Sequence, residues 1–202
     1  MRTFWLGLAV VTMAVAARAS DKVDVRVGDW VKTTSTTTAT GKSPNPTMTV
    51  LTRVKEISTI GPPPVSIKTA TTDVTGTARI PGKDQPQTIF SITSSTPIPF
   101  ATRSQNCDKD GVKVMVLEEG ERTVVVNGVT FADVFYQKTK TTHAAKDDRP
   151  AREVVAETWD DGKTPLWILK RVTTTTPQGQ ASSTTTEERV AYGRAGDPIP
   201  GD

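Results

Sequence analysis

The chain has 202 residues, with 25 Lys and Arg, 22 Asp and Glu, a single His and a single Cys. That length suits one domain, and a nearly balanced charge without a basic stripe argues against nucleic-acid binding, whose affinity comes largely from neutralising phosphates. One His and one Cys also cannot form the clustered His/Cys ligand sets of zinc sites.

The N-terminus has the features of a cleaved export signal. Arg2 gives it a positive start, residues 4–17 form an almost uninterrupted apolar run, and Ala17-Arg18-Ala19 supplies the small-x-small pattern of a signal-peptidase site. We expect cleavage after Ala19, because the run is shorter than the roughly 20 apolar residues that span a bilayer. The net charge of the mature protein is then closer to zero than that of the whole chain. The mature protein is expected to have no stable transmembrane segment and to be periplasmic or secreted.

After this leader, residues 1–19, short runs rich in Val, Ile, Thr and aromatic residues alternate with Gly, Pro, Asn and Asp. Such alternation is typical of strands and turns, and no helical period occurs. We predict strands at residues 24–40, 48–59, 65–74, 76–80, 87–94, 112–119, 122–126, 129–142, 152–159, 166–176 and 182–192.

The connections between these strands favour antiparallel pairing. Asn127-Gly128 between two apolar runs is the strongest short hairpin signal, because a type I′ turn needs positive φ at both central residues. Looser turns are expected at Gly120 and Gly179, and such short connections exclude the crossovers that parallel strands need. The predicted fold class is all-β: a strongly twisted antiparallel meander sheet or open half-barrel.

This sheet is expected to form a single domain, residues 20–192, followed by a disordered tail, residues 193–202. Its three threonine-rich runs, TTSTTTAT, TTTT and SSTTTEE, each extend a strand that begins or ends with core-type residues. We therefore favour a solvated sheet face over a glycosylated stalk. Cys107 has no partner in its own chain, and we favour a buried thiol; a free thiol or an intermolecular disulfide is the alternative.

The sequence lacks the set of groups that a reaction needs. His143 lies in a polar stretch, and no nucleophile elbow accompanies it. The stretch DKDG at residues 108–111 resembles the start of a calcium loop, but a strand follows where further ligands should be. A glycosidase needs two carboxylates that face each other across a cleft, and Glu157, beside Trp159, is the one acid in an apolar context. We predict a protein that is not an enzyme, with no catalytic residue, no metal and no cofactor; an enzyme that uses Glu157 or His143 is the least favoured alternative.

Three tryptophans remain as candidates for a ligand-binding site. Trp30 begins the first long strand, and Trp159 and Trp167 flank one acidic turn. Ligand pockets are commonly lined by aromatic side chains. The alternative, which we favour for a chain with few aromatic residues, is that the three rings fill the core of the sheet.

Three stretches, VRVGDWVKTTSTT, RTVVVNGVTFADVFYQKTK and AETWDDGKTPLWILKRVTTTT, together resemble a class of small exported bacterial proteins. The twisted sheet of that class is similar to the half-barrel of lipoprotein carriers and related lipid-binding proteins of the periplasm. This chain has Ala132 where such relatives often have Cys, and Trp167 where they often have Gly. It also shows no segment for the helices that cover the concave face in the carriers.

The resemblance implies a non-catalytic binding or structural role in the cell envelope, with an apolar, amphipathic or lipid-like ligand. The alternative is an extracellular interaction module that pairs with an envelope protein through a Thr-rich sheet face or through its edge strands.

Overall fold

In the computed structural model, residues 24–61, 67–80, 82–98, 104–145, 150–162 and 168–200 are described. They contain strands and turns but no helix, so none of them forms a helix that could cross a membrane. The strands are β1 (Trp30–Ala39), β2 (Met48–Ile60), β3 (Ile67–Ala78), β4 (Gln87–Ile98), β5 (Cys107–Lys109), β6 (Val112–Val126), β7 (Val129–His143), β8 (Arg152–Asp160), β9 (Lys170–Pro177) and β10 (Ser183–Gly193).

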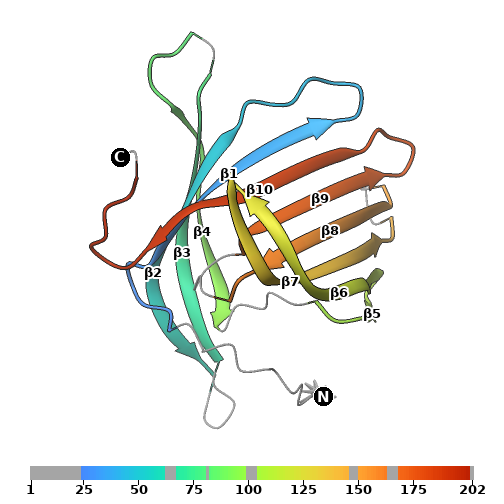
Figure 1. The fold of residues 1–202 in the computed structure, drawn as a ribbon. Coiled ribbons are helices and arrows are strands. Elements are labelled where there is room, and N and C mark those ends of the chain that lie inside the picture. Colours follow the sequence, from blue (N-terminus) through green and yellow to red (C-terminus); the bar gives the residue numbers. More distant parts are fainter. Residues whose placement is uncertain are drawn as a thin grey trace, which may run out of the picture.

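All ten strands belong to one open antiparallel sheet, in the order β4-β3-β2-β1-β10-β9-β8-β7-β6-β5 (Figure 1). This confirms the predicted all-β fold class. The first and last strands are neighbours in the middle of the sheet, since β1 pairs with both β2 and β10. The chain therefore builds one half of the sheet outward to the edge at β4, and the other half inward from the opposite edge at β5.

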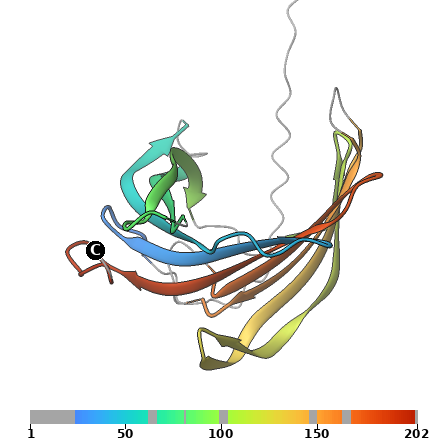
Figure 2. The same ribbon diagram turned by 90° about the horizontal axis from the view of Figure 1, so that it is seen from above.

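The sheet is bent into an arch, with an inner and an outer face (Figure 2). Because side chains alternate along a strand, the strand register assigns each residue to a face. We call the inner face the one that carries five buried side chains of β1 and β7, namely Val31, Thr33, Ser35, Gln137 and Thr139. Val25 of the N-terminal segment packs on Val31, and the segment at Ser104 is hydrogen-bonded to Gln137, which accounts for the burial of these two side chains.

Bulges contribute to this bend. The strand register shifts between Lys32 and Thr33 in β1, between Val54 and Glu56 in β2, and at further places in the pairings of β3 with β4 and β6 with β7. An extra residue on one strand increases the local twist and bends the strand. The threonine and valine content of the strands supplies the β-branched side chains that such a pleated surface favours.

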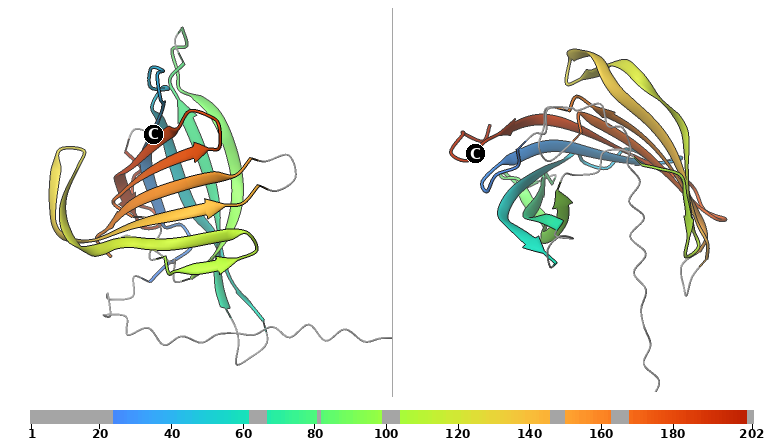
Figure 3. Two further views of the ribbon diagram at one scale, coloured as in Figure 1. Left: turned by 90° about the vertical axis from the view of Figure 1, so that its right-hand side faces the viewer. Right: turned by 90° about the horizontal axis from the view of Figure 1, so that it is seen from below.

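The buried apolar residues form two small clusters. One lies on the inner face, where Val25 from the N-terminal segment packs with Val31, Val54 and Ala70. The other forms where the long β6–β7 hairpin bends back on the sheet (Figure 3); its buried members are Val124, Val126, Val134 and Leu169. The Asn127 side-chain amide anchors the tip of that hairpin by donating to the Arg189 carbonyl of β10, at 2.8 Å. Asn127 and Gly128 both have positive φ, as predicted for this turn.

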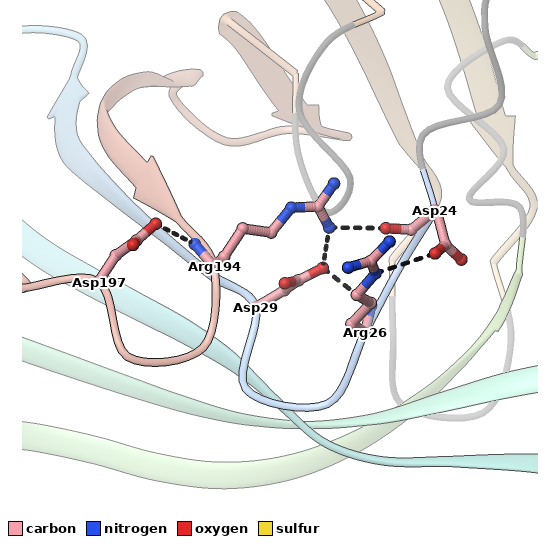
Figure 4. Close-up of polar contacts among 5 residues, drawn as sticks. All are labelled: Asp24, Arg26, Asp29, Arg194 and Asp197. Carbon is pink, nitrogen blue, oxygen red and sulfur yellow. Dashed lines mark hydrogen bonds and ion pairs between the residues drawn. The ribbon is translucent and has the colours of Figure 1, made fainter.

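The turn that leads into β1 and the segment that follows β10 meet beside these two strands (Figure 4). The Asp29 carboxylate is fully buried and accepts hydrogen bonds from the Arg26 backbone N–H, at 2.8 Å, and from the Arg194 guanidinium, at 2.7 Å. Gly28 has a φ of 88°, and a Cβ there would lie 2.5 Å from the Cβ of Ala195. Arg194 and Ala195 thus lie against the turn that precedes β1. The disordered tail expected over residues 193–202 stays a prediction.

Several sequence predictions are wrong in detail. No turn occurs at Gly120, because β6 runs unbroken through it and pairs along its length with β7. The predicted strands 65–74 and 76–80 are one strand, β3. Cys107 is exposed in the short edge strand β5 and is not a core residue. Threonines lie on both faces and not only on a solvated one: Thr37 and Thr185 form a hydroxyl pair on the inner face, with a separation of 2.9 Å between the two oxygens.

Candidate ligand-binding face

The part of the inner face over β1 to β4, here called the apolar half, carries an apolar patch together with inward hydroxyl groups such as those of Thr33 and Thr52. The register places Val50 beside Gly76 and Phe90, and places Val74 beside Ile92, on the inner side of these strands. Val50, Val74 and Phe90 are partly exposed, and Ile92 is 55% exposed. This leaves an apolar surface on the concave side, next to the cluster that Val25 covers.

The Phe90 ring is spread across this surface because its cross-strand partner is a glycine. A Cβ at Gly76 would lie 2.3 Å from the ring, so no other residue fits beneath it in this arrangement. Aromatic rings that cover a glycine on a neighbouring strand also help to fix strand register. The ring therefore lies against the backbone of β3, where it adds to the apolar half of the inner face.

The other half of the inner face, over β7 to β10, is polar. One row across these strands consists of Gln137, Thr158, Arg171 and Glu187, in successive register pairs. The next row consists of Thr139, Ala156, Thr173 and Thr185. Hydroxyl groups thus dominate this half, and each threonine also offers a methyl group.

Arg171 and Glu187 place a pair of opposite charges on the polar half. Arg171 Nη1 lies 3.8 Å from Glu187 Oε2, and both side chains are partly exposed. Burial raises the pKa of Glu187 above its usual value of 4.5, and the positive charge of Arg171 acts in the opposite direction. Glu187 is thus a carboxyl group that is more readily protonated than one in water, on a surface lined mainly by hydroxyls.

Gln137 fixes the chain that enters the second half of the sheet. Its side-chain oxygen accepts from the Ser104 backbone N–H at 2.8 Å, and its nitrogen donates to the Ser104 carbonyl at 3.0 Å. The same nitrogen lies 3.3 Å from a Glu119 carboxylate oxygen. A two-way side-chain to backbone contact of this kind holds the segment before β5 against the inner face.

The outer face differs in charge from the inner one. Its β7–β8 and β9–β10 pairs carry lysine–glutamate contacts: Lys138 with Glu157 at 3.1 Å, Lys140 with Glu153 at 2.5 Å, and Lys170 with Glu188 at 2.7 Å. Such partly exposed pairs add little stability each, but they are the charge pattern of a surface that faces water. The side of the sheet suited to a less polar occupant is therefore the inner one.

Glu157 has structural partners on the outer face. It accepts a hydrogen bond of 3.0 Å from the hydroxyl of Tyr136, which is almost fully buried. Burial, together with the hydrogen bond and negative charge of Glu157, raises the pKa of Tyr136 to about 12. Trp159 and Arg122 lie against the same tyrosine ring. The centroids of the Trp159 and Tyr136 rings are 5.2 Å apart, and the Arg122 guanidinium carbon is 4.0 Å from the Tyr136 centroid. Burial and Glu157 therefore favour the protonated form of Tyr136, whereas the positive charge of Arg122 acts in the opposite direction.

The predicted site tryptophans are not brought together on the inner face. Trp30 is 3% exposed, and its ring lies so close to Gly193 that a Cβ there would be 2.7 Å away. Trp159 is partly buried against the apolar cluster formed by the β6–β7 hairpin. It lies on β8, and β9 and β10 separate this strand from β1. Trp167 lies outside the described residues. A ligand-binding role for the three stays a prediction.

Of the remaining sequence candidates, His143 and the stretch 108–111 lie side by side. His143 ends β7 opposite Val112, and the Ala144 backbone N–H donates to the Gly111 carbonyl at 2.8 Å. Asp160 accepts from the Gly162 backbone N–H at 2.8 Å, so this carboxylate stabilises its own turn. Among the described residues, no three His, Cys, Asp or Glu side chains gather where they could hold a metal ion.

Sequence reasoning missed the inner-face residues, although their signal was present. Val31 and Thr33 flank the polar Lys32, and Val74 and Gly76 flank the polar Thr75, at the spacing of two expected for a half-buried strand. In β2 the pattern is weaker, because the apolar Leu51 lies between Val50 and Thr52. The alternation separates two faces but does not say which one becomes concave, since bulges and twist set the direction of the bend.

Comparisons with known proteins give only a distant likeness. No family model matches the chain, and no curated protein matches it. Among solved structures, it is similar to a LolA superfamily protein from Nitrosomonas europaea, with 9% identity, a TM-score of 0.25, and coverage of 90% of this chain and 91% of that one. It is also similar to a DUF1329 family protein from Desulfovibrio piger, with 10% identity, a TM-score of 0.25, and coverage of 89% and 90%.

The LolA superfamily match agrees with the resemblance that the sequence motifs suggested. At these TM-scores, neither likeness carries an argument about function, which has to come from the residues of this chain.

Proposed function

We propose that this chain is a non-catalytic, exported binding protein of the cell envelope, and that its inner face holds an amphipathic, lipid-like ligand. The observation that carries the proposal is the uneven distribution of side chains on that face. Partly exposed apolar side chains gather over β2 to β4, whereas hydroxyl groups and the Arg171–Glu187 charge pair predominate over β7 to β10. An amphipathic molecule is uneven in the same way.

The chemistry of each half matches one part of such a ligand. Val50, Val74, Phe90 and Ile92 offer apolar area whose removal from water favours binding of an acyl chain, at about 25 cal/mol per Å². Arg171 can donate to an anionic or ester oxygen, and Thr173 and Thr185 can donate or accept.

Export supports the same role. The apolar run at residues 4–17 and the Ala17-Arg18-Ala19 site direct the mature protein across the inner membrane. An envelope location brings it into contact with lipids and lipid-modified proteins. The missing catalytic set and the separate positions of His143 and Glu157 are consistent with binding as the whole activity.

The proposal is tested with the mature protein and an environment-sensitive fluorescent fatty acid. We expect saturable binding, with displacement by an unlabelled lysophospholipid and no displacement by its soluble headgroup alone. Failure of the fatty acid to bind, or binding that headgroup alone displaces, contradicts an apolar subsite on the inner face. Cleavage after Ala19 is checked on the exported protein by N-terminal mass spectrometry.

A further inference from the structure

The two edges of the sheet differ strongly. β5 is three residues long and carries Asp108 and Lys109, so that edge is short and charged. β4 is twelve residues long, QTIFSITSSTPI, and contains no charged residue. Among the described residues, β4 pairs with β3 alone. An edge strand presents a row of backbone N–H and C=O groups that another strand can pair with, and charge or shortness normally prevents this.

Only the ends of β4 carry features that discourage pairing. At one end Ile89 is the extra residue of a bulge, since Phe90 pairs with Gly76 and Thr88 with Thr77. At the other end Pro97 lacks a backbone N–H. Between them, residues 90–96 run in regular register with β3. Ile92, in this regular stretch, is among the more exposed large apolar residues of the chain.

We propose that the β4 edge is a docking strand for β4 of a second copy of this chain, paired antiparallel about a twofold axis perpendicular to the sheet. The unpaired backbone N–H and C=O groups along residues 90–96 can be satisfied by another extended strand. Two copies of one strand pair best when that strand carries no charge, because identical charges would otherwise face each other. The β4 strand of a second copy meets both needs at once. The β5 strand of a second copy does not, because its three residues cannot pair along the whole stretch.

A twofold axis of this kind keeps the two inner faces on the same side. Phe90 and Ile92 of one protomer then lie next to the same residues of its partner. The apolar halves of the two inner faces thereby form one continuous surface. Ser91, Thr93 and Ser95 face outward on both copies. Isologous contacts of this type close on themselves and give a dimer, not a fibre.

Sedimentation velocity on the mature protein measures the association. We expect a concentration-dependent monomer–dimer equilibrium, and we expect Ser91→Lys with Ser95→Lys to weaken the dimer about tenfold or more, because paired strands then bring like charges together. Val125→Lys with Val129→Lys is the matched control, since both valines are exposed on the β6–β7 hairpin, at 54% and 55%. This control should associate like the parent. A monomer at all soluble concentrations overturns the proposal.

Cysteine cross-linking identifies the strand that pairs. In a Cys107→Ser background, single cysteines are placed at each position from Ser91 to Ser95 and oxidised. The twofold axis brings one residue opposite itself, with Cβ atoms about 4.5–5.5 Å apart, so disulfide-linked dimers should peak at a single position. A dimer that forms without any such peak, or that survives the Ser91/Ser95 lysine variant unchanged, pairs through another surface and contradicts the proposal. Neither result depends on ligand binding.

Discussion

The Arg194 guanidinium lies 2.7 Å from a carboxylate oxygen of Asp29, 165 positions earlier in the chain. Asp29 is fully buried, whereas the Arg194 side chain is 46% exposed. The contact joins the turn that leads into β1 to the segment that leaves β10, and these two strands are the centre of the sheet. The contact therefore couples the segment that carries Val25 to the segment that follows β10.

Removing Arg194 should weaken the fold measurably. Arg194→Ala leaves a buried carboxylate with one donor fewer, and we expect the free energy of unfolding to fall by about 1–3 kcal/mol in urea titrations. Arg26→Ala is the control, because its side chain meets only the exposed Asp24 and its backbone N–H to Asp29 is kept. We expect a change within about 0.5 kcal/mol for the control. Equal losses in the two variants refute a special role for the Asp29–Arg194 contact.

Gly193 should not tolerate a side chain. Gly193→Ala places a methyl group 2.7 Å from the buried Trp30 ring, and we expect a loss of about 1–3 kcal/mol in unfolding free energy. Gly120→Ala in β6 is the control, since a Cβ there meets nothing within 4 Å and its φ is not positive. That variant should be neutral or slightly more stable. A tolerated Gly193→Ala means that Trp30 can leave this position, and its ring is then available to a ligand.

Tyr136 makes stability depend on alkaline pH. Its folded pKa of about 12 exceeds the usual 10.0, so the folded state retains the proton longer than the unfolded state. The free energy of unfolding should therefore fall as the pH rises from about 10 toward 12. Ultraviolet titration of the phenol is unambiguous in a Tyr192→Phe background, because the chain has two tyrosines.

Glu157→Gln should lower the pKa of Tyr136 but not return it to 10.0, because burial is the largest cause of the shift. Glu153→Gln, which removes an outer-face carboxylate paired with Lys140, should leave the titration unchanged. An unchanged Tyr136 titration in Glu157→Gln contradicts the hydrogen bond between these two side chains.

Glu187 contributes a pH dependence of stability that is opposite in sign to that of most carboxylates. Because its folded pKa is raised above 4.5, its contribution is most favourable below that pH and declines as the pH rises through the folded value. Glu187→Gln removes this declining contribution, so the free energy of unfolding above pH 4.5 should fall less, or rise more, with pH than in the parent. The comparison is made by urea titration across mildly acidic pH, and a slope identical to that of the parent contradicts burial of this carboxyl group.

The fold class and most strands could be read from the sequence because each strand has its own local signals. The Asn127-Gly128 turn and the alternation within residues 129–142 are independent of distant partners. Gly120 was misread as a turn, because a glycine inside a strand and a glycine between strands look alike until the partner strand is known. The pairing of β1 with β10 joins distant parts of the chain, so no local pattern reveals it.

The candidate site was harder to predict than the fold. The sequence pointed to the tryptophans as ligand-binding candidates. In the structure, Trp30 packs on Gly193 and Trp159 packs beside Tyr136. Val50, Val74 and Phe90 come together only through the register of three strands and the direction of the bend. Single residues in a sequence cannot show such a surface, because every threonine-rich strand here has two similar faces.

The central claim, an amphipathic ligand on the inner face, is tested most directly by one pair of neighbouring substitutions in β3. Val74 lies on the inner face and Thr75 on the outer face, and both are partly exposed. Val74→Glu should weaken binding of the fluorescent fatty acid about tenfold or more, because a carboxylate then has to be desolvated beneath the acyl chain. Thr75→Glu adds the same charge outside and should bind like the parent. With both variants shown to be folded by circular dichroism, equal affinities for the fatty acid contradict the inner face as its binding site.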